Sequence, residues 1–176
     1  MTERKTLQTG MTEQKQLRTG ATEFPFVGLH LELLVASGAK LPSRAYDDSI
    51  GLDIYAFLLS ESGRPNKAIL PPRTTRLIPT GISAKPPSGH AILVCSRSGL
   101  ATHSIFVTNA PGVVDADYRG EIKVLMYNGG HETYYIEHEQ RIAQLLVVPL
   151  PHVEMKIVTS LEPTARGEKG FGSTGL

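Results

Sequence analysis

The residues best suited to chemistry in this chain lie at one acidic bend. Residues 111–122 read PGVVDADYRGEI, so Asp115 and Asp117 follow one apolar run and precede another. Aspartate is depleted inside strands, which means that this pair serves either a turn or a reaction. The pattern predicts a β-hairpin with both carboxylates at its turn, and its free backbone groups could bind a pyrimidine edge. A solvated turn in which Arg119 pairs with a neighbouring carboxylate explains the same residues.

The C-terminal residues 166–176, RGEKGFGSTGL, combine phosphate-binding groups with glycine. Arginine and hydroxyl side chains bind phosphates, and an aromatic ring can stack on a base. Because four of the last ten residues are glycine, the segment cannot stabilise a helix or strand by itself. These features favour a lid that orders over a nucleotide, although simple disorder is the commoner state of a glycine-rich terminus.

A second group of phosphate-binding candidates lies in residues 95–101, CSRSGLA, where an apolar run ends. Arg97, Ser98 and the backbone of Gly99 could bind phosphate oxygens, helped by N–H groups at the start of a short helix. A surface turn is the alternative interpretation of this segment.

Two polar side chains interrupt apolar runs elsewhere. Gln144 lies within RIAQLLVV at 141–148 and needs a hydrogen-bond partner if it is buried, which backbone groups alone could supply. Asp53 lies within SIGLDIYA at 49–56, on the strand face opposite its aliphatic neighbours. It is either an exposed carboxylate or an anion near a hydrated metal.

Short apolar or alternating runs recur from Phe26 onward and predict the strands that position these side chains. Turn sequences such as SGRPN, KPPSG and NGG separate the runs. The expected strands are 29–35, 51–57, 74–82, 90–95, 121–128, 133–136, 142–148 and 153–158. The best candidate helix is 98–104, of about two turns. This pattern predicts an all-β fold, a jelly-roll-like barrel or sandwich with at most one short helix and a flexible glycine-rich C-terminal tail.

The chain divides into three parts. Residues 1–20 are two copies of one decapeptide, MTERKTLQTG and MTEQKQLRTG, which are too short and polar to form a repeat fold. We therefore expect residues 1–24 to be a disordered tail, residues 25–163 to form the β domain, and residues 164–176 to form the flexible lid.

Composition limits the partners of this protein. The 176 residues carry a formal net charge of +1, so no strong field attracts nucleic acid or a membrane, and we expect stable binding to neither. No apolar run approaches the length that crosses a bilayer. The single cysteine excludes an internal disulfide and favours a reducing, intracellular location, in the cytoplasm, the nucleus or both.

Five segments resemble the motifs of the deoxyuridine triphosphate nucleotidohydrolase (dUTPase) family, in order and in kind. SIGLD is similar to its first motif, SRSGLA to its second, GVVDADYRG to its third, RIAQL to its fourth and RGEKGFGSTG to its fifth. The resemblance extends from about Phe26 to the C-terminus. Ile50 replaces a small residue, Ser96 replaces a proline, and Lys169 fills a position that is often glycine. None of these removes a catalytic group, and we expect Lys169 to alter lid behaviour.

The resemblance implies hydrolysis of dUTP to dUMP and pyrophosphate, assisted by Mg²⁺ on the triphosphate. Asp115 would position and deprotonate a water that attacks the α-phosphorus in line, and such a base contributes about 10²–10⁴ in rate. Mg²⁺ prefers phosphate oxygens and retained waters, so no direct protein ligand is expected and Asp53 would touch the metal only through water. The reaction would limit uracil incorporation into DNA and supply dUMP for thymidylate synthesis.

The same resemblance implies how the substrate is held. Backbone groups between Asn109 and Asp115 would bind uracil, Tyr118 would pack against the sugar and exclude a ribose hydroxyl, and Phe171 would stack on the base. The expected substrate-binding residues are Arg97, Ser98, Gly99, Asn109, Gly112, Val113, Val114, Asp115, Tyr118, Lys123, Gln144, Arg166, Phe171, Gly172, Ser173 and Thr174.

The family is homotrimeric, with active sites shared among subunits and the tail of one subunit lent to another, and the resemblance implies the same here.

A dCTP deaminase is the nearest rival, but it needs an acid/base glutamate on the strand that here reads EIKVLMYN, whose inward candidates are apolar. A non-catalytic binding module is the other alternative. The presence of Asp115, Gln144, Arg166 and Phe171 disfavours it.

Overall fold

The structure, a computed structural model, describes residues 28–151, 153–168 and 170. These residues form eleven strands and one four-residue helix, so the expected all-β fold with one short helix is confirmed. The elements are β1 (Glu32–Val35), β2 (Leu52–Tyr55), β3 (Lys67–Leu70), β4 (Thr75–Ile78), β5 (Ile82–Lys85), β6 (His90–Cys95), α1 (Ser98–Ala101), β7 (Ile105–Val107), β8 (Gly112–Val114), β9 (Val124–Asn128), β10 (Tyr134–Glu137) and β11 (Arg141–Pro149).

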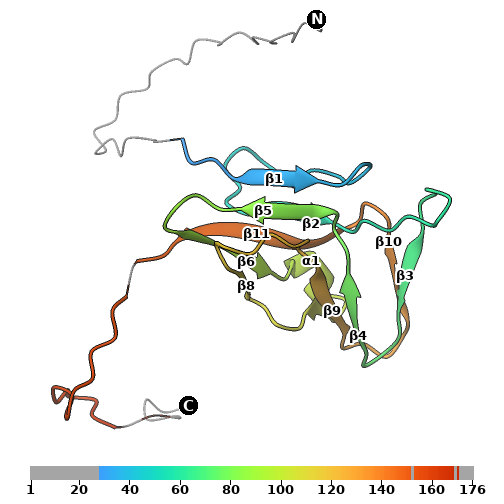
Figure 1. The fold of residues 1–176 in the computed structure, drawn as a ribbon. Coiled ribbons are helices and arrows are strands. Elements are labelled where there is room, and N and C mark those ends of the chain that lie inside the picture. The colour runs from blue at the N-terminus through green and yellow to red at the C-terminus, as the bar shows by residue number, and fades with distance from the viewer. Residues whose placement is uncertain (1–27, 152, 169, 171–176) are drawn as a thin grey trace, which may run out of the picture.

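The strands pair antiparallel in four small sheets, ordered β2-β11-β6-β8, β4-β9-β7, β1-β5 and β10-β3. Figure 1 shows β11 running across the body, while β3, β4 and β10 run steeply at one side. Most neighbouring strands are distant in sequence, as in Greek-key and jelly-roll folds. This arrangement brings the segment around Asp53 beside the segment around Gln144.

An aliphatic core holds the sheets together. Ile54, Ile92, Ile136, Ile142 and Leu145 have no solvent exposure, and they come from the strands β2, β6, β10 and β11. Burial of one such side chain contributes about 1.5–3 kcal/mol. The core therefore fixes the strands whose ends carry the polar residues of interest.

The strand β11 organises the largest sheet. Its nine residues pair with β2 near one end and with β6 along most of their length, and the register shifts between Arg141 and Ala143. Such an irregularity changes the direction of nearby side chains. As a result, Gln144 stands opposite both Asp53 and Cys95.

Within residues 67–85 the structure differs from the sequence prediction in one predicted strand and in one strand that was not predicted. The single strand expected over 74–82 is two strands, β4 and β5, because the chain turns through Pro79 and Gly81, where the φ of Gly81 is +67°. Proline cannot donate to a sheet, and glycine adopts this conformation without strain. The strand β3 was not predicted, because KAIL is a short run with few flanking signals.

The predicted hairpin at the acidic bend is wrong. The strand β8 pairs with β6, whereas β9 pairs with β4 and β7, so the bend connects two different sheets. The strand expected over 153–158 is also absent from the described chain, where these residues are exposed and extend beyond β11 (Figure 1). A strand needs a partner, and this segment has no strand partner among the described residues.

Candidate functional site

The first hollow of interest lies beside β8, and we call it the β8 pocket. It has a volume of about 200 Å³ and lies between β8, the acidic bend and the start of β9. Seven of the sequence-predicted site residues line it, namely Asn109, Gly112, Val113, Val114, Asp115, Tyr118 and Lys123.

The acidic bend is held by its own backbone. Asp115 follows the last residue of β8 and is exposed, and its carbonyl accepts a hydrogen bond from the N–H of Tyr118 at 3.1 Å. Nη1 of Arg119 donates to the carbonyls of Ala116 and Tyr118, both at 2.8 Å. Arg119 thus binds backbone carbonyls of the bend rather than a neighbouring carboxylate, and the exposed Asp115 is part of the lining of the β8 pocket.

Asn109 and Gly112, which both line this pocket, pack closely against each other. A Cβ at Gly112 would lie 3.0 Å from Nδ2 of Asn109, closer than ordinary van der Waals contact. Gly112 is buried and begins β8. Glycine at this position therefore lets the Asn109 amide lie close to the strand backbone.

The second hollow, which we call the Arg97 pocket, lies beside the segment that follows the end of β6. It is an open groove of about 540 Å³, and its lining includes the predicted residues Asp53, Arg97, Ser98, Gly99 and Gln144. Arg97 precedes α1, so the groove has N–H groups from the turn after β6 at one side. The loop that ends at Ile50 and Gly51 forms another side.

Asp53 is buried at this groove and binds two arginines. Its Oδ1 accepts from Nε of Arg97 at 2.8 Å and its Oδ2 accepts from Nη1 of Arg141 at 3.3 Å. Asp53 is only 8% exposed, so the alternative of an exposed carboxylate is wrong. The pair of guanidinium groups compensates the charge of this carboxylate and fixes the direction of Arg97.

Gln144 finds its partner in the same groove. Its Nε2 donates to the carbonyl of Ser96 at 3.2 Å, which leaves Oε1 to face Gly51. A Cβ at Gly51 would collide with that oxygen. Ser96, which departs from the family pattern, also accepts the N–H of Val107 through Oγ at 2.9 Å, so its hydroxyl joins this segment to β7.

The two hollows share no lining residue, although both involve the sheet β2-β11-β6-β8. Leu145, Val94 and Gly112 stand in register across β11, β6 and β8, so these positions share a face, and Val94 and Gly112 line the β8 pocket. Gln144 and Leu146 flank Leu145 and therefore face the other side, where they line the Arg97 pocket. One chain consequently does not present Asp115 and Gln144 to the same hollow.

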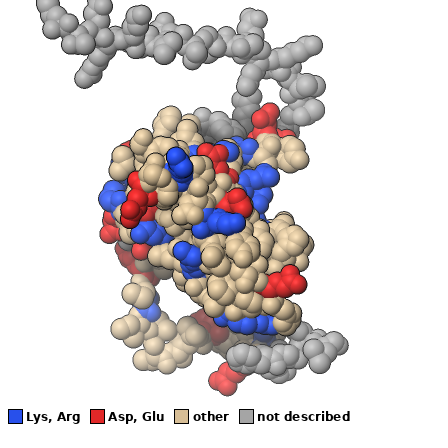
Figure 2. Space-filling model, turned by 90° about the vertical axis from the view of Figure 1, so that its right-hand side faces the viewer, with Lys and Arg blue, Asp and Glu red and all other residues tan. Residues whose placement is uncertain are grey.

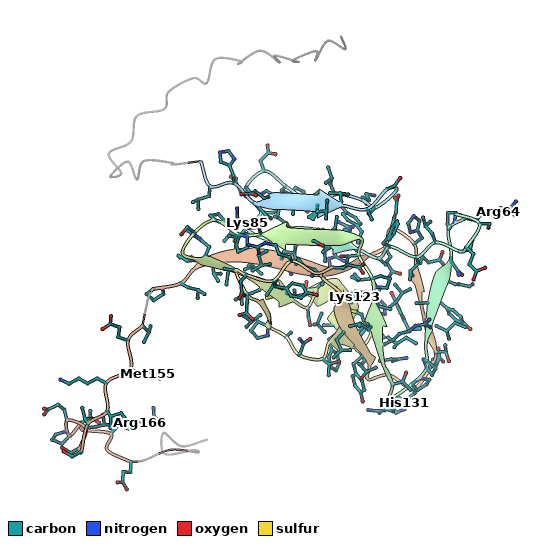
Figure 3. All side chains as sticks on the ribbon, in the orientation of Figure 1. Arg64, Lys85, Lys123, His131, Met155 and Arg166 are labelled. Atoms are coloured by element: carbon teal, nitrogen blue, oxygen red, sulfur yellow. The ribbon has the colours of Figure 1, made fainter. Side chains whose placement is uncertain are left out.

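The last predicted group belongs to the C-terminal segment. Arg166 lies on the chain that extends away from the body beyond β11, together with Met155 (Figure 3). It lines neither the β8 pocket nor the Arg97 pocket. Phe171, Gly172, Ser173, Thr174 and also Lys169 lie outside the described residues.

The ion pair with Lys85 changes the acidity of Glu32. A hydrogen bond from Lys85, and then the charge of Lys85, lower the pKa of Glu32 from its ordinary value, and Arg119 adds a smaller effect in the same direction. On the face shown in Figure 2, acidic and basic residues are intermixed.

Among the described residues, no three His, Cys, Asp or Glu side chains gather into a metal-binding group. Helices long and apolar enough to cross a membrane are likewise absent from that part of the chain.

Sequence reasoning missed two residues that organise these hollows. Arg141 was treated only as the start of an apolar run, yet it binds Asp53. Glu121 was not singled out, yet it lines the β8 pocket and accepts two backbone N–H groups through Oε1. Nothing in the local sequence reveals these partners, because they lie 88 and about 40 positions away.

Comparison with known proteins identifies the family of this fold. A dUTPase family model matches residues 37–175. The deoxyuridine 5′-triphosphate nucleotidohydrolase of Ehrlichia canis is 42% identical over 146 residues, covering 81% of this chain and 92% of its own. The enzyme of the same name from Anaplasma marginale is 43% identical over 146 residues, covering 82% and 95%.

Solved structures agree with the sequence comparisons. The dUTPase of Staphylococcus bacteriophage 80alpha, in a mutant form with dUpNHpp, superposes with a TM-score of 0.72 at 26% identity, covering 84% of this chain and 99% of its own. The same phage enzyme with dUpNHpp gives a TM-score of 0.72 at 28% identity and the same coverage. The chain therefore belongs to the dUTPase family and is a dUTP diphosphatase.

Proposed function

We propose that this enzyme hydrolyses dUTP by attack of a water molecule, held by Asp115, on the α-phosphorus. The carboxylate would take a proton as the water oxygen bonds to phosphorus, and the bond from that phosphorus to the bridging oxygen would break to release pyrophosphate. The observation that carries this proposal is the position of Asp115, exposed at the end of β8 and lining the β8 pocket. A general base must lie within hydrogen-bond distance of the water molecule before its pKa can affect the rate.

The edge of β8 suits recognition of the base. Among the described strands β8 ends its sheet and pairs only with β6, so the backbone groups on its outer side have no strand partner there. Such N–H and C=O groups at a concave site can bind uracil by a pattern that cytosine does not match. The Asn109 amide, packed against Gly112, would add a side-chain contact, and Val113 and Val114 would contribute their backbone.

Tyr118 supplies the wall that the sugar would meet. Tyr118 is 45% exposed and lines the pocket, and its hydroxyl donates a hydrogen bond to the carbonyl of Glu121 at 3.0 Å, which fixes the ring. A ring held in one place can exclude an added 2′-hydroxyl, whereas it accepts a deoxyribose. Lys123 would contribute at the edge of the same pocket.

The Arg97 pocket would bind the triphosphate. Arg97, Ser98, Gly99 and Gln144 line one groove, and spreading positive charge over phosphates is most of what phosphoryl-transfer catalysis requires. Mg²⁺ bound to the triphosphate would neutralise developing charge and orient the phosphates. Asp53 fits a water-mediated contact, because each carboxylate oxygen accepts from one arginine and retains capacity for a further hydrogen bond.

We also propose that each active site is shared between subunits of a homotrimer. The β8 and Arg97 pockets share no lining residue, so a nucleotide that needs both would use two copies of the chain. Apolar side chains on the outer face of β4-β9-β7, where Leu77 stands opposite Leu125 and Phe106 packs on Tyr127, offer a surface for such association. The C-terminal segment with Arg166 would reach a site on another subunit and close over the nucleotide with Phe171, Gly172, Ser173 and Thr174.

The consequence in a cell would be a low level of dUTP and a supply of dUMP. Removal of dUTP limits uracil incorporation into DNA, and dUMP serves thymidylate synthesis. The intermixed charges on the visible face give no reason to expect stable nucleic-acid binding (Figure 2).

The test of the proposal is pyrophosphate release from dUTP by Asp115→Asn, with Asp117→Asn as the matched control at the same bend. Loss of the base should lower kcat by about 10²–10⁴, while binding of a non-hydrolysable dUTP analogue should persist. Asp117→Asn should keep the rate near that of the native enzyme. An Asp115→Asn enzyme with unchanged turnover contradicts the proposed role of Asp115.

A further inference from the structure

Glu121 uses its two carboxylate oxygens for different partners. Its Oε1 accepts the backbone N–H groups of Thr80 and Gly81 at 2.9 and 2.8 Å, while its Oε2 lies 3.6 Å from Nζ of Lys123. Thr80 is buried, so the carboxylate satisfies backbone donors at the turn between β4 and β5. A buried N–H group left without a partner costs about 1–3 kcal/mol, so this contact contributes to the stability of the fold.

The segment that follows Glu121 is fastened to the same turn. Oγ1 of Thr80 donates to the carbonyl of Ile122 at 2.5 Å, and the N–H of Ile122 donates to the carbonyl of Ile82 at 2.7 Å. The turn itself has little freedom, because a Cβ at Gly81 would lie 2.6 Å from Cβ of Ala39. Residues 121 and 122 are therefore held against a tightly packed part of the core.

Tyr118 takes its position from this fixed segment. Its hydroxyl donates to the carbonyl of Glu121 at 3.0 Å, and its ring lies against Gly120, where an added Cβ would collide with the phenol oxygen. Because Tyr118 is 45% exposed, packing alone does not immobilise its ring. The hydrogen bond to residue 121 and the contact with Gly120 set the direction of the ring.

We propose that Glu121 is a positioning residue that fixes Tyr118 and Lys123 in the β8 pocket and so sets the discrimination between deoxyribonucleotide and ribonucleotide. This inference rests on the proposed function, which places the sugar against Tyr118. Exclusion of the ribose 2′-hydroxyl requires that the Tyr118 ring stay in place, because a ring that can shift by a fraction of an ångström leaves room for ribose. Glu121 acts through Tyr118 and touches no reacting atom.

The experiment measures kcat/KM for dUTP and for UTP in Glu121→Ala, Glu121→Gln and Tyr118→Phe, with Glu137→Gln as the control. Glu137 is an exposed glutamate of β10, outside both pockets that the proposed function uses. Loss of the carboxylate in Glu121→Ala should lower the dUTP-to-UTP ratio by about ten-fold, and loss of the hydroxyl in Tyr118→Phe by about three- to ten-fold. Glu121→Gln keeps an oxygen acceptor for both N–H groups and should retain the ratio within about two-fold. The control should match the native enzyme.

The melting temperature separates positioning from mere stability. If Glu121→Ala melts earlier but keeps the native ratio, Glu121 supports only the fold and the inference is overturned. If Glu121→Ala does not fold, Tyr118→Phe decides, since it removes one hydroxyl from a partly exposed ring, and an unchanged ratio there also overturns the inference. Tyr118→Ala tests the underlying proposal: an unchanged ratio in that variant refutes the sugar-packing role of Tyr118 itself, whereas absent dUTP turnover in the native enzyme would refute the proposed function.

Discussion

Nε of Arg97 donates to Oδ1 of Asp53 at 2.8 Å, and this contact fixes the side chain that we expect to bind phosphates. Asp53 is 11% exposed at its side chain and Arg97 is 23% exposed, so the pair is largely shielded from water. Arg141 binds the second carboxylate oxygen. The phosphate groove is therefore built on a carboxylate shared by two guanidinium groups.

Asp53→Asn should lower both stability and substrate binding. Asparagine keeps one oxygen acceptor but loses the charge that both arginines face, and hydrogen bonds to charged groups contribute about 1.5–3 kcal/mol. We expect the free energy of unfolding to fall by about 1–3 kcal/mol in urea denaturation, and the KM for dUTP to rise as Arg97 loses its fixed direction.

Glu32→Gln is the contrasting control. Glu32 and Lys85 form an ion pair at 2.7 Å, yet their side chains are 67% and 48% exposed, so water and salt screen the attraction. This variant should leave the denaturation midpoint nearly unchanged. Equal effects of the two substitutions would show that the burial of Asp53 has no energetic consequence.

Gly51→Ala should impair activity more than stability. An added Cβ would collide with Oε1 of Gln144, which is the end of a flexible side chain and can move away. Its displacement would break the hydrogen bond to Ser96, so kcat/KM for dUTP should fall by roughly ten-fold while the free energy of unfolding changes by less than about 1 kcal/mol. Gly28→Ala is the control for a glycine substitution without a collision, because its added Cβ would meet only Nε2 of His30, at 4.0 Å.

Local sequence predicted those strands whose pattern is self-contained. The run HAILVC gave β6 with its observed bounds, because a short apolar run between turn signals needs no knowledge of its partners. The acidic bend was misjudged as a hairpin because the pairing of β8 with β6 depends on contacts distant in sequence. The segment 153–158 alternates as a strand should, but alternation does not supply a partner.

Among the site residues too, some roles could be predicted from the local sequence and others could not. Gln144 was recognised as a polar interruption that needs a partner, and the structure supplies the carbonyl of Ser96. The role of Arg141 was not foreseeable, because a terminal arginine of an apolar run is ordinarily a solvated residue. Its partner, Asp53, comes from β2, and only the pairing of β2 with β11 brings the two residues together.

Removal of residues 165–176 should spare the fold and abolish efficient hydrolysis. The described residues 153–168 and 170 are exposed and contribute nothing to the aliphatic core, so the melting temperature should not change. Loss of Arg166 and of the ring of Phe171 removes a phosphate contact and a stacking partner, so kcat/KM should fall by about a hundred-fold or more. Arg166→Ala in the full chain isolates the guanidinium contribution, and full activity of the truncated enzyme would contradict the lid.

Mixed trimers of Asp115→Asn and Arg97→Ala subunits test whether one site uses two chains. Each variant alone should be nearly inactive, because one lacks the base and the other lacks a phosphate-binding group. If the β8 pocket of one subunit works with the Arg97 pocket of another, random assembly of equal amounts should leave about a quarter of all sites with two intact halves. In trimers that contain both variants the intact share should be about a third, because one of the three sites then pairs two intact halves. Co-expression with two affinity tags, followed by purification through both, would provide the mixed trimers for the pyrophosphate assay. A site built within a single chain has no intact copy in such a mixture, so activity that stays at the level of the separate variants would contradict sharing between subunits.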